Sequence, residues 1–136
     1  MRVFLDANVL FSAAKSDGAV RHLLMLLETS GHECCVDSYV IEEARRNLVA
    51  KAPDCVVALD KLLSRMKKVG AQRSDAALEA SLPLPAKDRP VLAGAIHQNC
   101  TALVTGDRTH FGPLYGRTIH GVTIHSPRSL AEALLV

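Results

Sequence analysis

Short apolar runs alternate with amphipathic segments along most of the chain. Four of these runs are short and apolar throughout, which predicts buried strands at residues 3–5, 34–36, 101–105 and 122–125. Apolar residues at helical spacing, with Ser38, Asp88 and Ser126 as candidate N-caps, predict helices over residues 18–30, 38–51, 54–67, 88–98 and 127–134. Residues 70–87 contain the sequence SLPLPAK, in which each Pro favours an extended loop.

The order of these elements indicates a fold class. Buried strands separated by amphipathic helices predict an α/β protein with a three-layer α/β/α arrangement, in which helices cover both faces of a mainly parallel sheet. The chain has 136 residues, no internal repeat and no linker-like segment, so we expect a single domain over residues 1–136.

Acidic residues follow two of the predicted strands. Asp6 comes directly after the first strand and Asp107 after the third, and ligands of open α/β sheets bind at the carboxyl ends of the strands. Asp88 opens the helix that leads into the third strand, where a helix cap is the simplest interpretation of this residue taken alone. Converging carboxylates repel one another unless a cation is present, and Mg²⁺ and Mn²⁺ prefer carboxylate ligands. The acids therefore predict a site for such an ion.

A fourth acid comes from the helix predicted over residues 38–51, which contains two adjacent glutamates. Glu43 lies nearer than Glu42 to the edge of the apolar face and shares its side of the helix with Asn47. Glu43 is therefore the better ligand, although the angular difference is small and the choice between the two stays open. In the competing interpretation both glutamates face water and pair loosely with Arg45 or Arg46.

Composition narrows the range of functions. Aromatic residues make up 4% of the chain and Trp is absent, which argues against a base-stacking platform for single-stranded nucleic acid. The formal net charge of +2 does not demand a polyanionic partner. The four cysteines form no C-x-x-C pair and are expected to be reduced thiols, and no His-x-x-x-His pair indicates zinc. No signal peptide or membrane-spanning stretch is recognisable, so we expect a cytoplasmic protein without membrane contact.

Several motifs taken together resemble a known family. FLDANVL contains Asp6, VIEEARRNL contains Glu43, KDRPVLAGAIHQN contains Asp88 and LVTGDRTHFG contains Asp107. At these spacings the motifs resemble the PIN domain family, and in particular its single-domain toxins of VapC type. The closing HSPRSLAEAL also resembles the last strand and helix of that family, so the likeness covers nearly the whole chain.

The resemblance implies a PIN-like fold and a metal-dependent endoribonuclease that acts as the toxin of a type II toxin–antitoxin pair. It makes Asp6, Glu43, Asp88 and Asp107 the acidic quartet that binds Mg²⁺ or Mn²⁺ and carries the catalysis. It also implies three partners: an RNA substrate, a cognate antitoxin that covers the acidic cleft, and a second copy of the chain in a homodimer.

Other polar residues near the quartet have supporting roles in this scheme. The resemblance places Asn8 and Thr105 beside the first and last acids, where a hydrogen bond can hold the rotamer of a metal-bound carboxylate. Arg89, Arg108 and His110 flank the proposed ligands and are candidate contacts to RNA phosphates. The alternative interpretation of these three residues is that they are surface side chains that balance nearby acids.

Two other functions fit parts of the sequence. A non-catalytic PIN-fold module would bind RNA or protein without cleaving it, although this chain retains all four acids. A phosphohydrolase with Asp6 as a covalent nucleophile usually has a second Asp two positions later, where this chain has Asn8.

Overall fold

The computed structural model describes residues 1–70 and 75–135 of the chain. The strands in these ranges form one sheet in the order β3-β2-β1-β4-β6-β5, in which β5 pairs antiparallel with β6 and the other pairs are parallel. The strands are β1 (Arg2–Leu5), β2 (Glu33–Asp37), β3 (Lys67–Val69), β4 (Ala102–Val104), β5 (Thr118–Ile119) and β6 (Val122–His125). The mainly parallel sheet expected from the sequence is therefore confirmed.

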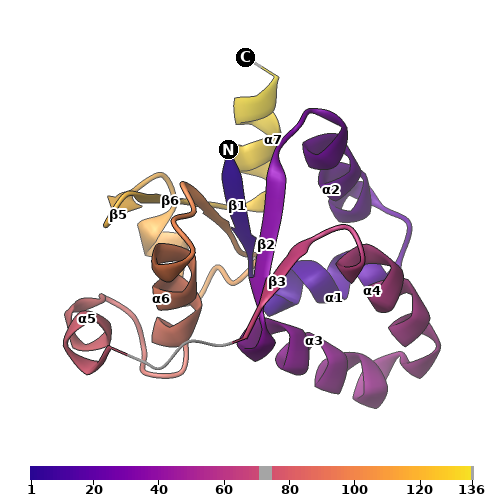
Figure 1. The fold of residues 1–136 in the computed structure, drawn as a ribbon, viewed down its shortest axis with the longest axis horizontal. Coiled ribbons are helices and arrows are strands. Elements are labelled where there is room, and N and C mark those ends of the chain that lie inside the picture. The colour runs from indigo at the N-terminus through magenta and orange to yellow at the C-terminus, as the bar shows by residue number, and fades with distance from the viewer. Residues whose placement is uncertain (71–74, 136) are drawn as a thin grey trace.

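Helices pack on both faces of this sheet. Figure 1 shows the sheet nearly edge-on, with α1 to α4 on one side and α6 on the other. The helices are α1 (Ala7–Lys15), α2 (Ala19–Thr29), α3 (Ser38–Lys51), α4 (Val56–Leu63), α5 (Ala76–Ser81), α6 (Arg89–His97) and α7 (Pro127–Leu134), with short 3₁₀ turns η1 (Pro53–Cys55) and η2 (Gly112–Leu114). This arrangement confirms the three-layer α/β fold class. In the described part of the chain, no helix is both long and apolar enough to cross a membrane.

Strand β1 lies in the middle of the sheet and is buried on both faces. Val3, Phe4 and Leu5 have no exposed surface, because β2 and β4 flank the strand and helices cover it. In the register, Phe4 lies between Cys35 of β2 and Leu103 of β4. A parallel strand covered on both sides explains why this segment is a continuous apolar run without alternation.

The winding of the chain changes direction at β1. The chain passes from β1 to β2 and β3 on one side of the sheet, then crosses to β4 on the other side. In open α/β sheets such a reversal leaves a crevice at the carboxyl ends of the two diverging strands. Here the two strands are β1 and β4. In Figure 1 the carboxyl ends of β1 and its neighbour β2 lie at the bottom of the sheet, near the start of α3.

Helix α1 is the largest departure from the sequence prediction, which placed no helix directly after the first strand. The side chain of Asp6 is the N-cap of α1, and its Oδ1 accepts a hydrogen bond from the Ala7 amide at 2.7 Å. Val9, Leu10 and Ala13 then pack into the core. A short apolar run gives the same signal for a strand and for a buried helix, so periodicity alone could not separate them.

The region from residue 54 to residue 69 also differs from the prediction of one helix over residues 54–67. Helix α4 ends at Leu63, and the Lys68 ammonium donates to the Leu63 carbonyl at 2.7 Å, which satisfies one of the free carbonyls of the last turn. Strand β3 follows at Lys67–Val69 and lies at the edge of the sheet beside β2. Its sequence KKV has no apolar pattern, so its pairing with β2 is what defines it as a strand.

Smaller corrections concern caps and loops. The N-cap side chain of α3 is Asp37, whose Oδ1 accepts from the Val40 amide at 3.1 Å, rather than the predicted Ser38. Helix α5 ends at the start of the extended loop predicted for SLPLPAK, in a part of residues 70–87 for which no helix was predicted, and residues 71–74 lie outside the described residues. The two-residue strand β5 was not predicted, whereas α7 begins after Ser126 as expected.

The packing of α6 against the end of β2 depends on a glycine. A Cβ atom at Gly94 would lie 2.6 Å from Oδ2 of Asp37 and 3.1 Å from Cζ of Phe4. Asp37 is buried and caps α3, and Phe4 is fully buried, so neither side chain can move without losing a contact. Gly94 therefore allows α6 to approach the sheet closely.

We expect Gly94→Ala to lower the free energy of unfolding by about 1–3 kcal/mol, since overpacking forces buried neighbours out of place. Urea denaturation followed by circular dichroism measures the change. Gly70→Ala is the matched control, because a Cβ there meets no atom within 4 Å. Equal midpoints for the two variants would show that α6 has room to shift.

Candidate functional site

The carboxylate of Asp6 joins the ends of β1 and β4. Its Oδ2 accepts hydrogen bonds from Thr105 Oγ1 at 2.8 Å and from Asn8 Nδ2 at 3.1 Å, while Oδ1 accepts from the Ala7 amide. The other end of the Asn8 amide group, Oδ1, accepts from the Gly106 amide at 2.7 Å. The structure therefore places Asn8 and Thr105 against the first acid, as the sequence predicts.

Asp107 is fixed by the loop that follows β4. Its Oδ1 accepts from the backbone amides of Thr109 at 3.1 Å and His110 at 3.2 Å, and its own amide donates to Thr105 Oγ1 at 3.1 Å. Its Oδ2 lies 3.0 Å from Nδ1 of His110. The carboxylate is held in one orientation before any ligand binds.

Asp88 occupies the N-cap position of α6, but its side chain makes no capping hydrogen bond. The cap interpretation of this residue is therefore wrong. Its Oδ2 lies 2.9 Å from Nδ1 of His110, which also contacts Asp107 and carries at most one hydrogen. Oδ2 of Asp88 is buried and accepts no hydrogen bond within the described ranges, so its contact with His110 is an ion-pair approach only.

Helix α3 contributes the fourth acid. Glu43 and Asn47 line the cleft beside Asp6, whereas Glu42 is exposed to solvent. The orientation predicted from helical geometry thus agrees with the structure. All four predicted acids border one cleft of about 250 Å³ at the carboxyl ends of the strands: Asp6, Glu43, Asp88 and Asp107.

The surroundings of Asp6 alter its protonation. Burial, with smaller contributions from the nearby carboxylates of Glu43 and Asp88, raises the pKa of Asp6 to about 6. The hydrogen bonds from Thr105 and Ala7 act in the opposite direction, because they stabilise the charged form. A positive charge close to Asp6 would therefore stabilise its ionised carboxylate.

The donor set fits a divalent cation. Ligand atoms of Asp88, Asp107 and His110 all lie within 4.8 Å of one another, and Oδ2 of Asp88 accepts no hydrogen bond among the described residues. Carboxylate oxygens with one imidazole suit Mg²⁺ or Mn²⁺ better than a soft metal. Sequence reasoning identified His110 only as a candidate phosphate contact, and its position three residues after Asp107 was the signal that could have shown its place beside the acids.

A cationic rim borders the acids on the side of α1 and α3. Lys51 and Lys87 line the cleft, and the ammonium groups of Lys15 and Lys51 each lie 5.7 Å from the centroid of the Phe11 ring. Tyr39 Oη donates to the Lys87 carbonyl at 2.8 Å, which ties α3 to the loop before α6. Lys51 is eight residues after Glu43 on the same helix, so helical spacing could have predicted that both share a face.

Two predicted phosphate contacts do not line this cleft. Arg89 Nε donates to the Leu84 carbonyl at 2.8 Å, so its guanidinium holds the loop before α6. Arg108 is exposed and lies on the other side of the Asp107 loop, where it borders a separate groove.

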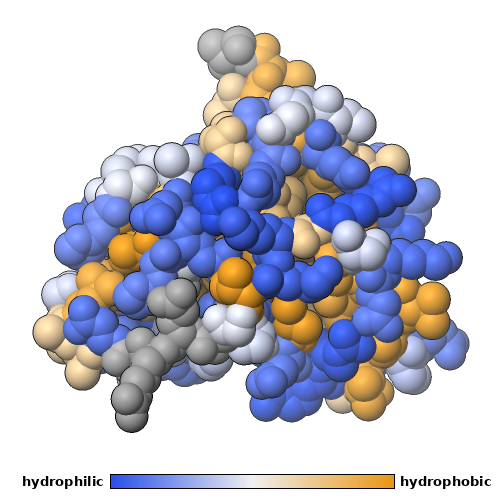
Figure 2. Space-filling model, viewed as in Figure 1, coloured by the Kyte–Doolittle hydropathy of each residue, from blue (hydrophilic) through white to orange (hydrophobic). Residues whose placement is uncertain are grey.

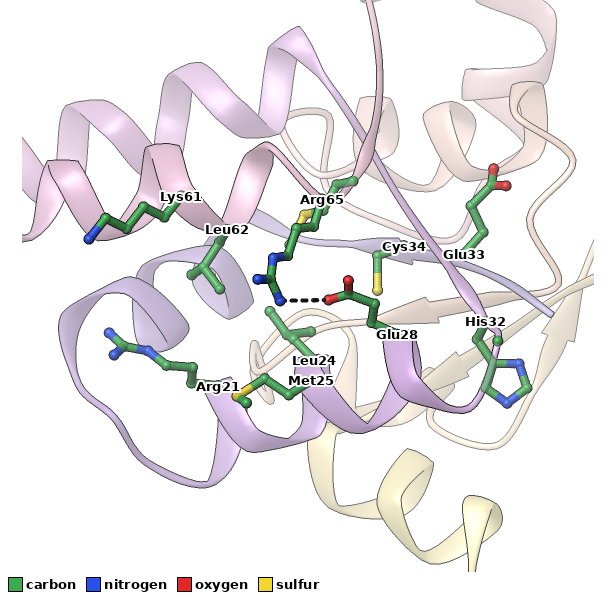
Figure 3. A pocket seen from close by; sticks show the side chains of 12 residues that line it. Arg21, Leu24, Met25, Glu28, His32, Glu33, Cys34, Lys61, Leu62 and Arg65 are labelled. Atoms are coloured by element: carbon green, nitrogen blue, oxygen red, sulfur yellow. Dashed lines mark hydrogen bonds and ion pairs between the residues drawn. The ribbon is translucent and has the colours of Figure 1, made fainter.

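A larger cavity of about 420 Å³ lies elsewhere, between α2, α4 and the start of β2 (Figure 3). Leu24, Met25 and Leu62 contribute an apolar lining, and Arg65 pairs with Glu28 at 3.4 Å across it. Apolar residues also come to the surface over α3 and α4 in Figure 2, although hydrophilic residues cover most of that face. The cavity is far from the carboxyl ends of the strands and has no cluster of unpaired acids among its described lining residues, so it is not the metal site.

The sequence matches the family model of the PIN domain over residues 2–109. The chain therefore belongs to the PIN domain family, which confirms the resemblance seen in its motifs. No curated protein matches the sequence.

Solved structures share this fold. VapBC2 from Rickettsia felis, bound to a promoter DNA fragment, has a TM-score of 0.68 and 19% identity, covering 93% of this chain and 98% of that chain. VapBC-1 from nontypeable Haemophilus influenzae has a TM-score of 0.65 and 12% identity, with coverage of 94% and 99%. VapC20 from Mycobacterium tuberculosis, a toxin that cleaves the sarcin-ricin loop, has a TM-score of 0.56 and 13% identity, with coverage of 79% and 91%. At these identities the likeness shows a shared fold.

The raised pKa of Asp6 predicts a specific pH dependence of stability. Because the folded, metal-free protein binds this proton more tightly than the unfolded chain, the stabilisation is present below pH 3.8 and is lost as the pH rises through about 6. Asp6→Asn removes this titration. As the pH rises across that range, the free energy of unfolding of the variant should increase by up to about 3 kcal/mol relative to that of the wild type.

Urea denaturation in EDTA, at one pH below 3.8 and one above 6, measures this difference. Asp54→Asn removes an exposed carboxylate outside the cleft and corrects for the loss of one negative charge. If the difference in free energy of unfolding between wild type and Asp6→Asn is the same at both pH values, the prediction is contradicted.

The Thr105 hydroxyl connects two of the acids, so its removal should affect both folding and the site. Thr105→Val keeps the shape but leaves Asp6 Oδ2 with one donor fewer, and we expect a loss of about 1–3 kcal/mol in unfolding free energy. Thr105→Ser keeps the hydroxyl and should lose only about 1 kcal/mol from the missing methyl group. Thermal and urea unfolding compare the two variants; a Ser variant as unstable as the Val variant would assign the effect to packing.

Proposed function

We propose that this chain is an Mg²⁺- or Mn²⁺-dependent endoribonuclease and the toxin of a type II toxin–antitoxin pair. The observation that carries the proposal is the convergence of four carboxylates on one cleft, where a buried oxygen of Asp88 accepts no hydrogen bond in the described structure and has His110 beside it. The PIN fold and the likeness to VapC20, a toxin that cleaves the sarcin-ricin loop, support RNA as the substrate.

All four acids share one task in this proposal, which is to bind the ion. Asp6, Glu43, Asp88 and Asp107 would hold the ion together. Two of these carboxylates are oriented before the ion binds, because Asp107 accepts hydrogen bonds from two backbone amides and Asp6 accepts one from the Thr105 hydroxyl. When bound, a divalent ion lowers the pKa of water and neutralises charge on a phosphodiester during in-line displacement. Cleavage by this route leaves a 3′-hydroxyl and a 5′-phosphate.

The basic rim orients the substrate. Lys51 and Lys87 lie beside the acids, where their ammonium groups can neutralise RNA phosphates next to the scissile one. His110 holds Asp88 and Asp107 near each other and is a further candidate ligand or phosphate contact. These contacts to the phosphate backbone carry no base specificity by themselves.

The partners in this proposal follow from the neighbouring structures. VapBC2 and VapBC-1 are toxin–antitoxin complexes, and we propose that a cognate antitoxin covers the acidic cleft of this chain in the cytoplasm and that the free enzyme forms a homodimer. Met25 and Leu26 of α2 are exposed and offer apolar contact area for such a partner. Light scattering tests the dimer, and inhibition of cleavage by the product of a small reading frame next to the gene tests the antitoxin.

The adjacent glutamates of α3 provide a direct test of the metal site. We expect Glu43→Gln to lower Mn²⁺-dependent cleavage of a single-stranded RNA at least about 100-fold, because it removes one charged ligand from the cleft. Glu42→Gln is the matched control and should stay within about twofold of the wild type, since Glu42 is exposed. Cleavage rates are measured on a labelled oligoribonucleotide with Mn²⁺ and with EDTA.

Calorimetric titration with Mn²⁺ accompanies this assay. Loss of Mn²⁺ binding in Glu43→Gln but not in Glu42→Gln supports the assignment. A wild-type protein that neither binds Mn²⁺ at millimolar concentrations nor cleaves RNA would overturn the proposal and favour a non-catalytic PIN-fold module.

A further inference from the structure

A second groove lies on the other side of the loop that holds Asp107. It has a volume of about 560 Å³, and it is lined by glycine, proline and tyrosine with two arginines among them. Its lining includes Gly106, Arg108, Gly112, Tyr115, Pro127 and Arg128. The glycines leave backbone open to a ligand, and the Tyr115 hydroxyl donates to the Thr105 carbonyl at 2.8 Å, which fixes the tyrosine against the end of β4.

This groove begins next to the candidate metal centre. Asn8 lines the acidic cleft and accepts a hydrogen bond from the amide of Gly106, which lines the groove. The next two residues divide between the two sites, since Asp107 borders the cleft and Arg108 borders the groove. A polymer that crosses the cleft can therefore continue into the groove without a gap.

The charge of the groove is opposite to that of the cleft. Arg108 is exposed, and its guanidinium makes no hydrogen bond or ion pair among the described residues, although its carbonyl accepts from the Gly112 amide. Among residues 1–70 and 75–135, Arg128 forms an ion pair only with Glu132 of its own helix, at 3.1 Å, and its side chain is 89% exposed. An exposed pair of this kind contributes little, so both guanidinium groups are available to an anion.

The two basic regions flank the acids. Lys51 and Lys87 lie at the cleft itself, on the side of α3 and the loop before α6, and the two arginines lie beyond the Asp107 loop. A nucleic-acid strand has phosphates at regular spacing, so one strand laid across the acids meets positive charge on both sides. The apolar surface of Tyr115 and Pro127, which line the same groove as the arginines, suits the ribose and base of a nucleotide.

We propose that this groove is a substrate subsite, in which Arg108 and Arg128 bind the phosphate of a nucleotide next to the cleavage site and Tyr115 and Pro127 contact its ribose and base. The inference rests on the proposed function, since it names the path of the single-stranded RNA that the acidic cleft cleaves. Arg108 and Arg128 act by positioning RNA and take no part in the chemistry.

The test measures RNA binding separately from cleavage. Anisotropy of a fluorescein-labelled single-stranded oligoribonucleotide, recorded in EDTA over a series of salt concentrations, compares wild type with Arg108→Ala/Arg128→Ala. Loss of two phosphate contacts should reduce the slope of log K against log salt by about 1.4, which is an affinity loss of about 20-fold near 0.1 M salt. The matched control is Arg65→Ala/Arg117→Ala, which removes the same charge from exposed arginines outside both sites and should keep the wild-type slope.

Two further measurements distinguish this inference from the proposed function. Arg108→Lys/Arg128→Lys should restore the slope, because charge is retained. Mn²⁺-dependent hydrolysis of bis(4-nitrophenyl) phosphate, which is too small to reach the groove, should be unchanged in the alanine variant, whereas the KM for RNA rises and kcat does not fall.

The outcomes are separable. An unchanged salt slope in Arg108→Ala/Arg128→Ala, an equal reduction in the control, or no RNA binding by the wild type overturns the subsite. If the wild type hydrolyses neither RNA nor bis(4-nitrophenyl) phosphate, but Arg108→Ala/Arg128→Ala still reduces the salt slope of RNA binding, the nuclease proposal is overturned and the RNA-binding groove is kept.

Discussion

Asp6 lies where β1 ends and α1 begins, with its carboxylate buried against the end of β4. It accepts hydrogen bonds from Ala7, Asn8 and Thr105, so one side chain starts a helix and joins two strands that are far apart in the sequence. A buried charge is costly, and burial accordingly raises the pKa of this carboxyl. The hydrogen bonds offset part of that cost, and a bound cation would offset the remainder. The junction that organises the fold is therefore also the place where the fold needs an external positive charge.

Asp37 shows that a buried acid after a strand does not by itself make such a site. It is the last residue of β2, whereas Asp6 comes directly after β1; it also caps the next helix, and burial raises its pKa as well. Its Oδ2, however, lies against Gly94 of α6, where the missing side chain leaves room for it. Asp37 thus fixes α6 on the sheet, whereas Asp6 faces Glu43 and Asp88 across a cleft. The difference lies in which neighbour each acid meets, and that is set by the order of strands.

The sequence predicts the parts of this protein that depend on local pattern. Apolar runs predict β1, β2, β4 and β6, and the position of Glu43 relative to the apolar face of α3 predicts which glutamate faces the cleft. It fails where tertiary contact decides. The segment after Asp6 becomes a helix because the core covers it, and β3 becomes a strand because β2 pairs with it. Asp88 looks like a helix cap in the sequence, and only its distance from His110 shows that its side chain points elsewhere.

The positions of the charged residues say more than the net charge about where RNA would bind on this surface. A net charge of +2 conceals four carboxylates on one cleft, with lysines at its rim and arginines beyond the next loop. Without a cation, phosphate is repelled from the acids and attracted to the two basic regions. With a cation in the cleft, that repulsion is neutralised and a strand held on both sides is brought over the acids. In this arrangement the basic residues determine where the strand lies, and the bound ion determines whether its phosphate can approach the site of cleavage.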